Sequence, residues 1–185
     1  MSDDVSRIFI EAKALLEGHF LLTSGRHGGQ YLEKFQVLQN PSATERLCRM
    51  IADRFRDERP SVVVGPTTGG IIVAYEVARQ LGLRGIFAES DGPGRTLKRG
   101  FRIEPGERTL VVDDVLTTGG SIHEVLAVVQ QHGGIPVGIG VLVDRSQGKV
   151  DFGVPLYGCY TLNVPSYEAE ACPLCKQGVP LVTPH

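Results

Sequence analysis

The sequence lacks any long apolar run. None of its 185 residues falls in a stretch of about 18 consecutive apolar residues, the length that a membrane-spanning helix needs. The first residues, "MSDDVSRIFIEAKALLEGHF", carry acids where a secretory signal peptide requires positive charge. We therefore expect no contact with a membrane and a cytoplasmic protein.

The sequence also lacks an excess of basic residues. Its 19 Lys and Arg residues stand against 21 Asp and Glu residues, which gives a net charge of -2. Binding to nucleic acid by bulk electrostatics needs a positive field, so a nucleic-acid partner is not expected, although a local basic loop is compatible with this balance. The apolar fraction of 42% is ordinary for a globular protein, and the length suits one domain with a sizeable core.

Cysteine is scarce, with Cys48, Cys159, Cys172 and Cys175 as the four examples. In a reducing compartment these side chains are expected to be thiols. Cys172 and Cys175 form one C-x-x-C, but no second C-x-x-C and no paired-histidine cluster completes the usual four ligands of a zinc site. We expect a structural tail with incidental thiols, and the alternative is a metal bridged between two subunits.

What the sequence does contain is an alternation of helix and strand patterns. Short β-branched runs without polar alternation predict strands that are buried on both faces, and segments of helical period that end at glycine predict helices. The order indicates βαβ units, and so an α/β fold with a central parallel sheet flanked by helices. The predicted elements are helix 5–17 ended by Gly18, loops and short strands over 19–40, helix 41–60 with a Ser42–Glu45 capping box, strand 61–65, helix 69–82, strands 84–89 and 109–114, helix 121–134 with a Ser121–Glu124 capping box, and strand 135–145.

Polar segments follow four of the predicted strands. Ligands of parallel sheets bind outside the carboxyl ends of the strands, so we expect these segments to meet at one edge of the sheet. The segments are "GPTTGG" (65–70), "AESDGPGRTLKRG" (88–100), "DDVLTTGGS" (113–121) and "VDRSQG" (143–148).

The segment "TLVVDDVLTTGGS" (109–121) combines acids with a loop of glycines and hydroxyls. The glycines expose backbone N–H groups and the following helix points its positive end at the loop, so the loop suits a phosphate without any lysine. Asp113 and Asp114 suit Mg²⁺ or the hydroxyls of a sugar. Together they describe a ribose 5-phosphate; the alternatives are a capped strand–helix turn and a solvated Asp pair. Neither a Walker loop nor a G-x-G-x-x-G fingerprint is present.

This segment resembles the thirteen-residue motif with which type I phosphoribosyltransferases bind phosphoribosyl pyrophosphate (PRPP). The resemblance implies that the two acids lie beside the ribose hydroxyls and that the loop holds the 5-phosphate. It also implies that loop 65–70 contacts pyrophosphate; this loop has no lysine, so its backbone and two threonines would have to serve. The residues expected to bind PRPP are Thr67, Thr68, Gly69, Arg95, Lys98, Asp113, Asp114, Val115, Leu116, Thr117, Thr118, Gly119, Gly120 and Ser121.

The chain resembles the orotate phosphoribosyltransferases over nearly its whole length. Besides the motif, "LLTSGRHGGQYLE" (21–33) is similar to the segment that builds a small hood, and "VGPTTGGIIVAYEVA" and "VLVDRSQG" match later segments. The resemblance implies that Arg145 and Thr117 contact orotate, since a guanidinium binds a carboxylate through two hydrogen bonds. The alternative for Arg145 is a surface pair with Asp144.

The basic segment 91–100 is expected to be a mobile loop that closes over pyrophosphate. The resemblance implies that this loop works in the neighbouring subunit of a homodimer. Lys98 and Arg99 are the candidates for stabilising the leaving group, beside Asp113 and Asp114 as catalytic residues. The histidine of the family's loop has no counterpart here, and His123 in the next helix is no substitute. The alternative is an exposed loop that is merely basic.

The resemblance thus implies an orotate phosphoribosyltransferase, which joins the phosphoribosyl group of PRPP to orotate in pyrimidine biosynthesis. Mg²⁺ would be held mainly by PRPP and water, with no direct protein ligand. The alternatives are a purine phosphoribosyltransferase, a PRPP-sensing regulator without catalysis, and a structural protein. One domain is expected, with a hood region (1–40), an α/β core (41–150) and C-terminal strands and tail (151–185), the tail being a further candidate part of the hood.

Overall fold

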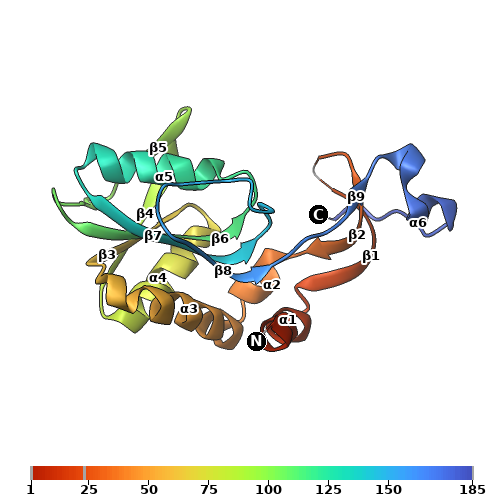
Figure 1. Ribbon diagram of the computed structural model, residues 1–185, viewed down its shortest axis with the longest axis horizontal. Coiled ribbons are helices and arrows are strands. Elements are labelled where there is room, and N and C mark those ends of the chain that lie inside the picture. Colours follow the sequence, from red (N-terminus) through yellow and green to blue (C-terminus); the bar gives the residue numbers. More distant parts are fainter. Residues whose placement is uncertain (1, 23, 185) are drawn as a thin grey trace.

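The computed structural model describes residues 2–22 and 24–184 and divides into two lobes (Figure 1). The larger lobe holds a six-stranded sheet with helices on both faces, and the smaller lobe holds a three-stranded sheet. Across the described residues, the structure contains no helix that is both long enough and apolar enough to cross a bilayer. Thr23, part of the segment in which the hood is expected, lies outside the described residues.

The six-stranded sheet confirms the predicted α/β class. Its order is β5-β4-β3-β6-β7-β8, and all neighbouring strands run parallel except β4 and β5. Strand β3 is buried at every position, which explains why its sequence shows no polar alternation. The strands are β3 (Val62–Pro66), β4 (Arg84–Asp91), β5 (Gly94–Leu97), β6 (Arg108–Leu116), β7 (Ile135–Asp144) and β8 (Leu156–Thr161).

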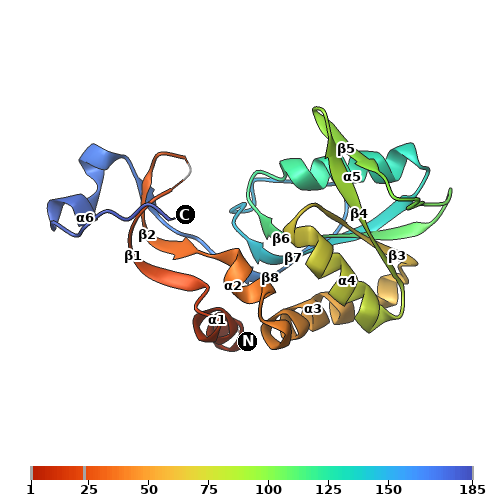
Figure 2. The ribbon, with the colours of Figure 1, turned by 180° about the vertical axis from the view of Figure 1, so that it is seen from behind.

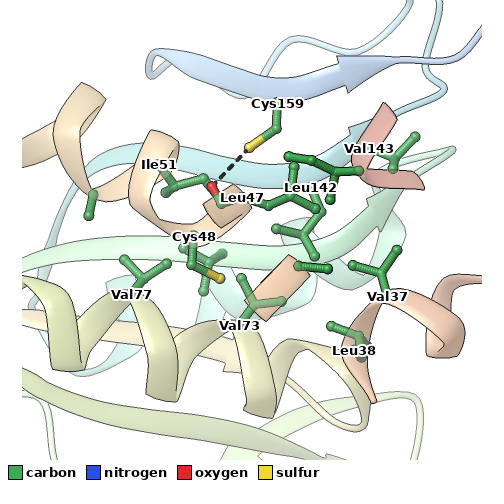
Figure 3. Packing of buried hydrophobic residues seen from close by; sticks show 14 of the residues in the cluster. Val37, Leu38, Leu47, Cys48, Ile51, Val73, Val77, Leu142, Val143 and Cys159 are labelled. Atoms are coloured by element: carbon green, nitrogen blue, oxygen red, sulfur yellow. Dashed lines mark hydrogen bonds between the residues drawn. The ribbon is translucent and has the colours of Figure 1, made fainter. Parts of the chain in front are cut away.

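Two apolar clusters fix the helices to the sheet. Helices α3 (Pro41–Phe55) and α4 (Gly69–Leu81) cover one face, where α3 packs against β7 and β8 and α4 packs against β3, β4 and β6; Figure 3 shows part of this cluster. Helix α5 (Gly120–Gln131) covers the other face. The close contact of α3 depends on glycine, because a Cβ at Gly140 would lie 2.3 Å from Cγ2 of Ile51.

The N-terminal helix is shorter than predicted. Helix α1 spans Ser2–Glu11, and the chain then forms β1 (Leu15–Leu21) instead of continuing to Gly18. Lys13 ends the helix with a φ of 55°, and Ala14 donates its N–H to the carbonyl of Phe9. The apolar pattern over 5–17 did not separate the two elements, because the helix and the strand each bury apolar residues within the same short run.

Both predicted capping boxes are wrong. Helix α3 starts one residue before Ser42, and Oδ1 of Asn40 accepts the N–H of Ala43 at 3.2 Å. The helix ends at Phe55 and is followed by the 3-10 turn η1 (Arg56–Glu58). The N-cap of α5 is Gly119, which has no side chain to accept a hydrogen bond. The carboxylate of Glu124 instead forms an ion pair with Arg95.

The smaller lobe, which we call the hood, comprises residues 15–22, 24–32 and 165–184. Strand β1 pairs with β2 (His27–Leu32), and β2 pairs with β9 (Ser166–Tyr167), in both cases antiparallel. The chain end returns along β1, where the N–H of Val182 donates to the carbonyl of His19 at 2.8 Å. The two ends of the chain therefore build the hood together. Its remaining elements are η2 (Ala169–Ala171) and α6 (Pro173–Lys176).

The segment expected as a long basic loop is largely a β-hairpin. Strands β4 and β5 pair from Ala88 with Leu97 to Asp91 with Gly94, and Gly92 in the turn has a φ of 60°. The glycines, the proline and the polar composition of this segment are typical of a loop, so the sequence did not indicate the pairing of β4 with β5. The hairpin projects from the body of the larger lobe (Figure 2), while α2 (Lys34–Leu38) joins the two lobes.

Candidate functional site

A cavity of about 400 Å³ lies where β3 and β6 end and the hood begins. Its walls come from three separate parts of the chain: the end of β2 and the start of α2, the loop after β3, and the segment from the end of β6 to the start of α5. Arg145 adds a fourth contribution from the end of β7. The lining residues are Tyr31, Leu32, Lys34, Pro66, Thr67, Thr68, Gly69, Asp113, Asp114, Val115, Thr117, Ser121 and Arg145.

The paired acids lie near the end of β6, and both are buried. Oδ1 of Asp113 accepts the N–H of Asp114, and Oδ1 of Asp114 accepts the N–H of Val115. Burial and, after it, the adjacent charge of Asp114 raise the pKa of Asp113 to about 7, in spite of the lowering effects of the backbone hydrogen bond and of Lys34. A solvated Asp pair in a turn is therefore excluded.

Lys34 supplies the counter-charge for this pair. Its Nζ lies 2.9 Å from Oδ2 of Asp114, whose side chain is only 5% exposed. No described residue makes a geometrically sound hydrogen bond to that oxygen. Asp114 lines the main cavity, but its Oδ2 is itself buried, and in this structure that oxygen contacts the ammonium group of Lys34.

The loop after β3 approaches the same carboxylate very closely. A Cβ at Gly69 would lie 1.8 Å from Oδ2 of Asp114, so only glycine fits there. Helix α4 begins at this glycine, and its first N–H groups have no intrahelical partner. Thr67 and Thr68, joined by a cis peptide bond, also line the cavity.

A second, smaller cavity of about 50 Å³ adjoins the first. Gly119 turns the chain into α5 with a φ of 83°, and a Cβ there would lie 2.9 Å from the ring of Phe152. Gly120 and Ser121, the first two residues of the 12-residue helix α5, line this cavity. The positive N-terminal end of the helix therefore faces it. The geometry suits an anion of phosphate size. The cavity is lined by Asp113, Val115, Leu116, Thr117, Thr118, Gly119, Gly120, Ser121 and Ile122.

Arg95 does not line either cavity, but it contacts two elements that form their walls, the loop after β3 and helix α5. Its side chain is 9% exposed, and its Nε lies 2.9 Å from Oε2 of Glu124. Its Nη1 donates to Oγ1 of Thr67 at 3.1 Å and to the carbonyl of Ala88 at 3.2 Å. In this arrangement the guanidinium holds the loop after β3 against α5.

Lys98 and Arg99 follow β5 directly, just beyond the last paired residue of the hairpin. Nζ of Lys98 lies 3.4 Å from Oδ1 of Asp91, and Nε of Arg99 lies 2.8 Å from Oε1 of Glu89. Both side chains are exposed, and neither is among the described residues that line the two cavities. Within one chain, the fold does not bring them to the paired acids.

Arg145 lines the main cavity directly after β7. Its N–H donates to the carbonyl of Leu116 at 2.8 Å, which holds the loop after β7 beside the end of β6. Oδ1 of Asp144 accepts the N–H of Ser146, and within the described part of the chain no ion pair joins Asp144 to Arg145. The guanidinium is thus available to an anionic ligand.

Tyr31 and Lys34 line the cavity although the sequence did not single them out. Tyr31 belongs to the segment 21–33 that resembles a hood, and Lys34 is the next residue but one after Leu32. A basic residue directly beyond a recognised hood segment was the available signal. Only the tertiary structure, which places the start of α2 beside the end of β6, shows that this lysine meets Asp114.

Comparison with known proteins extends these observations. The family model described as "Phosphoribosyl transferase domain" matches residues 35–163. An orotate phosphoribosyltransferase of Pelotomaculum thermopropionicum is 56% identical over 182 residues, covering 98% of this chain and 96% of the relative. That of Caldanaerobacter subterraneus is 50% identical with the same coverage.

Solved structures agree. The crystal structure of orotate phosphoribosyltransferase from Aeropyrum pernix superimposes with a TM-score of 0.74 at 28% identity, covering 85% of this chain and 93% of that chain. The Mycobacterium tuberculosis enzyme in complex with inorganic phosphate gives a TM-score of 0.69 at 25% identity, covering 86% of this chain and 96% of that chain. With relatives matched over nearly its whole length and a fold shared with these structures, the chain belongs to the orotate phosphoribosyltransferases within the phosphoribosyltransferase family.

Proposed function

We propose that the chain transfers the 5-phosphoribosyl group of PRPP to orotate, giving orotidine 5'-monophosphate and pyrophosphate. One observation carries the proposal: the guanidinium of Arg145 and the buried acids Asp113 and Asp114 line one cavity of about 400 Å³, and a smaller cavity that suits a phosphate adjoins it. A site for PRPP and orotate needs these three kinds of group together. Close relatives that carry this name support the same reaction.

Asp113 and Asp114 hold the ribose in this proposal. Both carboxyl groups line the main cavity and accept hydrogen bonds from the ribose hydroxyls, and Lys34, 2.9 Å from Oδ2 of Asp114, supplies a counter-charge. The 5-phosphate occupies the smaller cavity, where backbone N–H groups at the start of α5 and the hydroxyls of Thr117, Thr118 and Ser121 donate to it. The pyrophosphate lies against the loop after β3, at Thr67, Thr68 and Gly69.

The reaction forms a bond from N1 of orotate to C1 of the ribose while the bond to pyrophosphate breaks. By analogy with glycosyl transfer, positive charge builds up on the ribose in the transition state, and two adjacent carboxylates stabilise that charge. Burial strengthens this effect because water screens the charges less. Orotate brings its own negative charge, so Arg145 serves to bind and orient it through two hydrogen bonds.

The donor set is compatible with magnesium held mainly by the substrate. Asp114 is already neutralised by Lys34, and Mg²⁺ commonly keeps its waters and binds through substrate phosphates and one or two carboxylates. The ion would neutralise charge on the pyrophosphate as it leaves. Within the chain, the acids then accept hydrogen bonds from ribose hydroxyls and water.

The hairpin residues Lys98 and Arg99 act on the neighbouring subunit of a homodimer in this proposal. They lie outside the cavities of their own chain, directly after the hairpin that projects from the larger lobe. Mixing Lys98→Ala protein with Arg145→Ala protein should restore part of the activity. The matched control pairs Lys98→Ala with the double variant Lys98→Ala/Arg145→Ala, which cannot form an intact site. Equal activity in the two mixtures would show that the hairpin does not work in trans.

A substrate competition tests the function itself. The protein is incubated with PRPP and Mg²⁺ and with orotate, adenine or hypoxanthine, and the ultraviolet change on base consumption is followed. We expect consumption of orotate alone. The Asp113→Asn/Asp114→Asn variant, which keeps the shape of both side chains, should be folded and nearly inactive. Consumption of a purine instead would favour the purine enzyme, and no consumption of any base would favour a regulator.

A further inference from the structure

Four side chains of types that can ligate a metal ion lie close together in the hood, away from the two cavities described above. They are His19 on β1, His27 on β2, Cys172 before α6 and Cys175 within α6. Their ligand atoms all lie within 4.8 Å of one another. The sequence showed no paired-histidine cluster beside these thiols because the two histidines are distant in sequence, and the return of the chain end along β1 brings the thiols to them.

The separations fit a tetrahedral zinc ion. With Zn–S bonds of about 2.3 Å and Zn–N bonds of about 2.05 Å, ideal geometry places nitrogen and sulfur about 3.6 Å apart and two nitrogens about 3.3 Å apart. Nε2 of His19 lies 3.5 Å from Sγ of Cys172 and 3.7 Å from Sγ of Cys175. Nδ1 of His27 lies 3.3 Å from Sγ of Cys175 and 3.0 Å from Nε2 of His19. Each of these four separations is within about 0.4 Å of the ideal value, and the remaining two pairs, both with Cys172, lie within 4.8 Å.

A second-layer contact orients the first histidine. Nδ1 of His19 lies 2.8 Å from the carbonyl oxygen of Val179. A carbonyl only accepts, so Nδ1 carries the proton and Nε2 presents its lone pair to the cluster. Metal-bound histidines in proteins are typically fixed by such a hydrogen bond from the other ring nitrogen.

The cluster is buried, which favours a closed structural site. His19, His27 and Cys172 are 2%, 6% and 0% exposed, and Cys175 alone is exposed. The four side chains complete a Cys₂His₂ set, so no position is left open for a substrate. The two cysteines are free thiols rather than a disulfide in this structure.

The hood also needs a support of this kind. Leu15 and Leu32, at the junction of the hood with the larger lobe, contribute to one apolar cluster. None of the other described hood residues, within 16–31 and 165–184, belongs to either cluster. A unit this small rarely buries enough apolar surface to hold itself together, and natural examples use disulfides or a structural metal. The four side chains join the first two strands of the hood to the tail.

We propose that His19, His27, Cys172 and Cys175 bind one structural zinc ion that fixes the C-terminal tail to β1 and β2. Two thiolates and two neutral imidazoles balance the charge of the divalent ion. Strand β2 carries His27 at one end and the cavity residue Tyr31 near the other. The ion thus also steadies the hood wall of the cavity, although the site stands independently of the proposed activity.

Metal analysis of the whole, untagged protein tests the proposal. Protein from zinc-supplemented cultures should hold about one zinc ion per chain after extensive dialysis. The Cys175→Ser variant changes an exposed position and should lose most of this zinc while staying folded, whereas Cys48→Ala removes a thiol outside the cluster and should keep it. Zinc well below one per chain in the reduced wild type, or equal zinc in Cys175→Ser and wild type, would overturn the proposal.

Cobalt gives a second readout that does not depend on a variant folding. Reduced, metal-free wild-type protein is titrated with Co²⁺, and tetrahedral thiolate coordination should produce thiolate-to-cobalt charge-transfer bands together with intense visible bands. These bands should be displaced by zinc and weakened in Cys175→Ser. Weak octahedral bands only, or a Cys172–Cys175 disulfide found by thiol titration of freshly prepared protein, would contradict the assigned ligand set.

Discussion

Asp113→Asn should make the protein more stable at neutral pH while nearly abolishing turnover. The folded state raises the pKa of Asp113 to about 7 because the carboxyl is buried beside Asp114. The unfolded chain releases the same proton near pH 3.8. Ionising Asp113 in the folded protein is therefore unfavourable. Asparagine removes that charge, and its Oδ1 can still accept the N–H of Asp114.

The pKa difference sets the magnitude. Below pH 3.8 both states hold the proton, so there is no difference in stability from this group. Between pH 3.8 and about 7 only the folded state holds it, and the free energy of unfolding falls with rising pH. At 1.36 kcal/mol per pKa unit, the loss is roughly 1.6 kcal/mol at pH 5 and about 4 kcal/mol above pH 7. Asp113→Asn has no carboxyl group to ionise at this position, so it should show neither of these decreases in the free energy of unfolding.

Urea unfolding of wild type and Asp113→Asn at pH 5 and pH 8, without substrates, measures the effect. The stability advantage of the variant should widen by roughly 2.5 kcal/mol between the two pH values. Glu124→Gln, which removes an acid from the ion pair with Arg95, is the control and should show no such widening. A variant advantage that is equal at both pH values, or absent at pH 8, would refute the raised pKa.

Three further changes test the packing of the site. Lys34→Met should lower the free energy of unfolding in urea by about 1–2 kcal/mol and weaken PRPP binding in calorimetry, because buried Asp114 loses its counter-charge. Lys34→Arg, which keeps the charge, should have smaller effects on both quantities. Unchanged stability and binding in Lys34→Met would refute the pairing. Gly69→Ala should cut turnover by about tenfold or more, since its Cβ would meet Asp114; wild-type kinetics would show that the loop yields freely. Gly140→Ala should lower the free energy of unfolding by about 1–3 kcal/mol through overpacking against α3, whereas Gly94→Ala, which faces open space, should not; equal losses would contradict this packing.

Local patterns in the sequence were enough for the core of the fold. Strand β3 is an uninterrupted β-branched run, and helix α4 shows a helical period that ends at Gly82, so both were found within one or two residues. These patterns fail where two elements share one run, as in α1 and β1, or where polar composition hides a pairing, as in the β4–β5 hairpin. Such cases depend on contacts with other segments.

Half of the site was predictable for the same reason. The rule that ligands bind at the carboxyl ends of parallel strands placed Asp113, Thr117 and Arg145 together, and all three line the main cavity. The rule gave no information on orientation. It grouped Arg95 with the ligand-binding residues, whereas the fold turns this guanidinium toward Thr67 and Glu124. The roles assigned to these residues, the magnesium ion and the homodimer remain predictions.

The sequence by itself determined the α/β core and placed the glycine loop and the paired acids at the end of one strand, because each depends on residues that are close together along the chain. Only the tertiary structure decided which distant groups meet. It brought Lys34 to Asp114, and it carried the C-terminal thiols of Cys172 and Cys175 back to the histidines of β1 and β2. The physical reason is that such contacts follow from where α2 lies relative to β6 and from the return of the chain end along β1, which short-range periodicity does not encode.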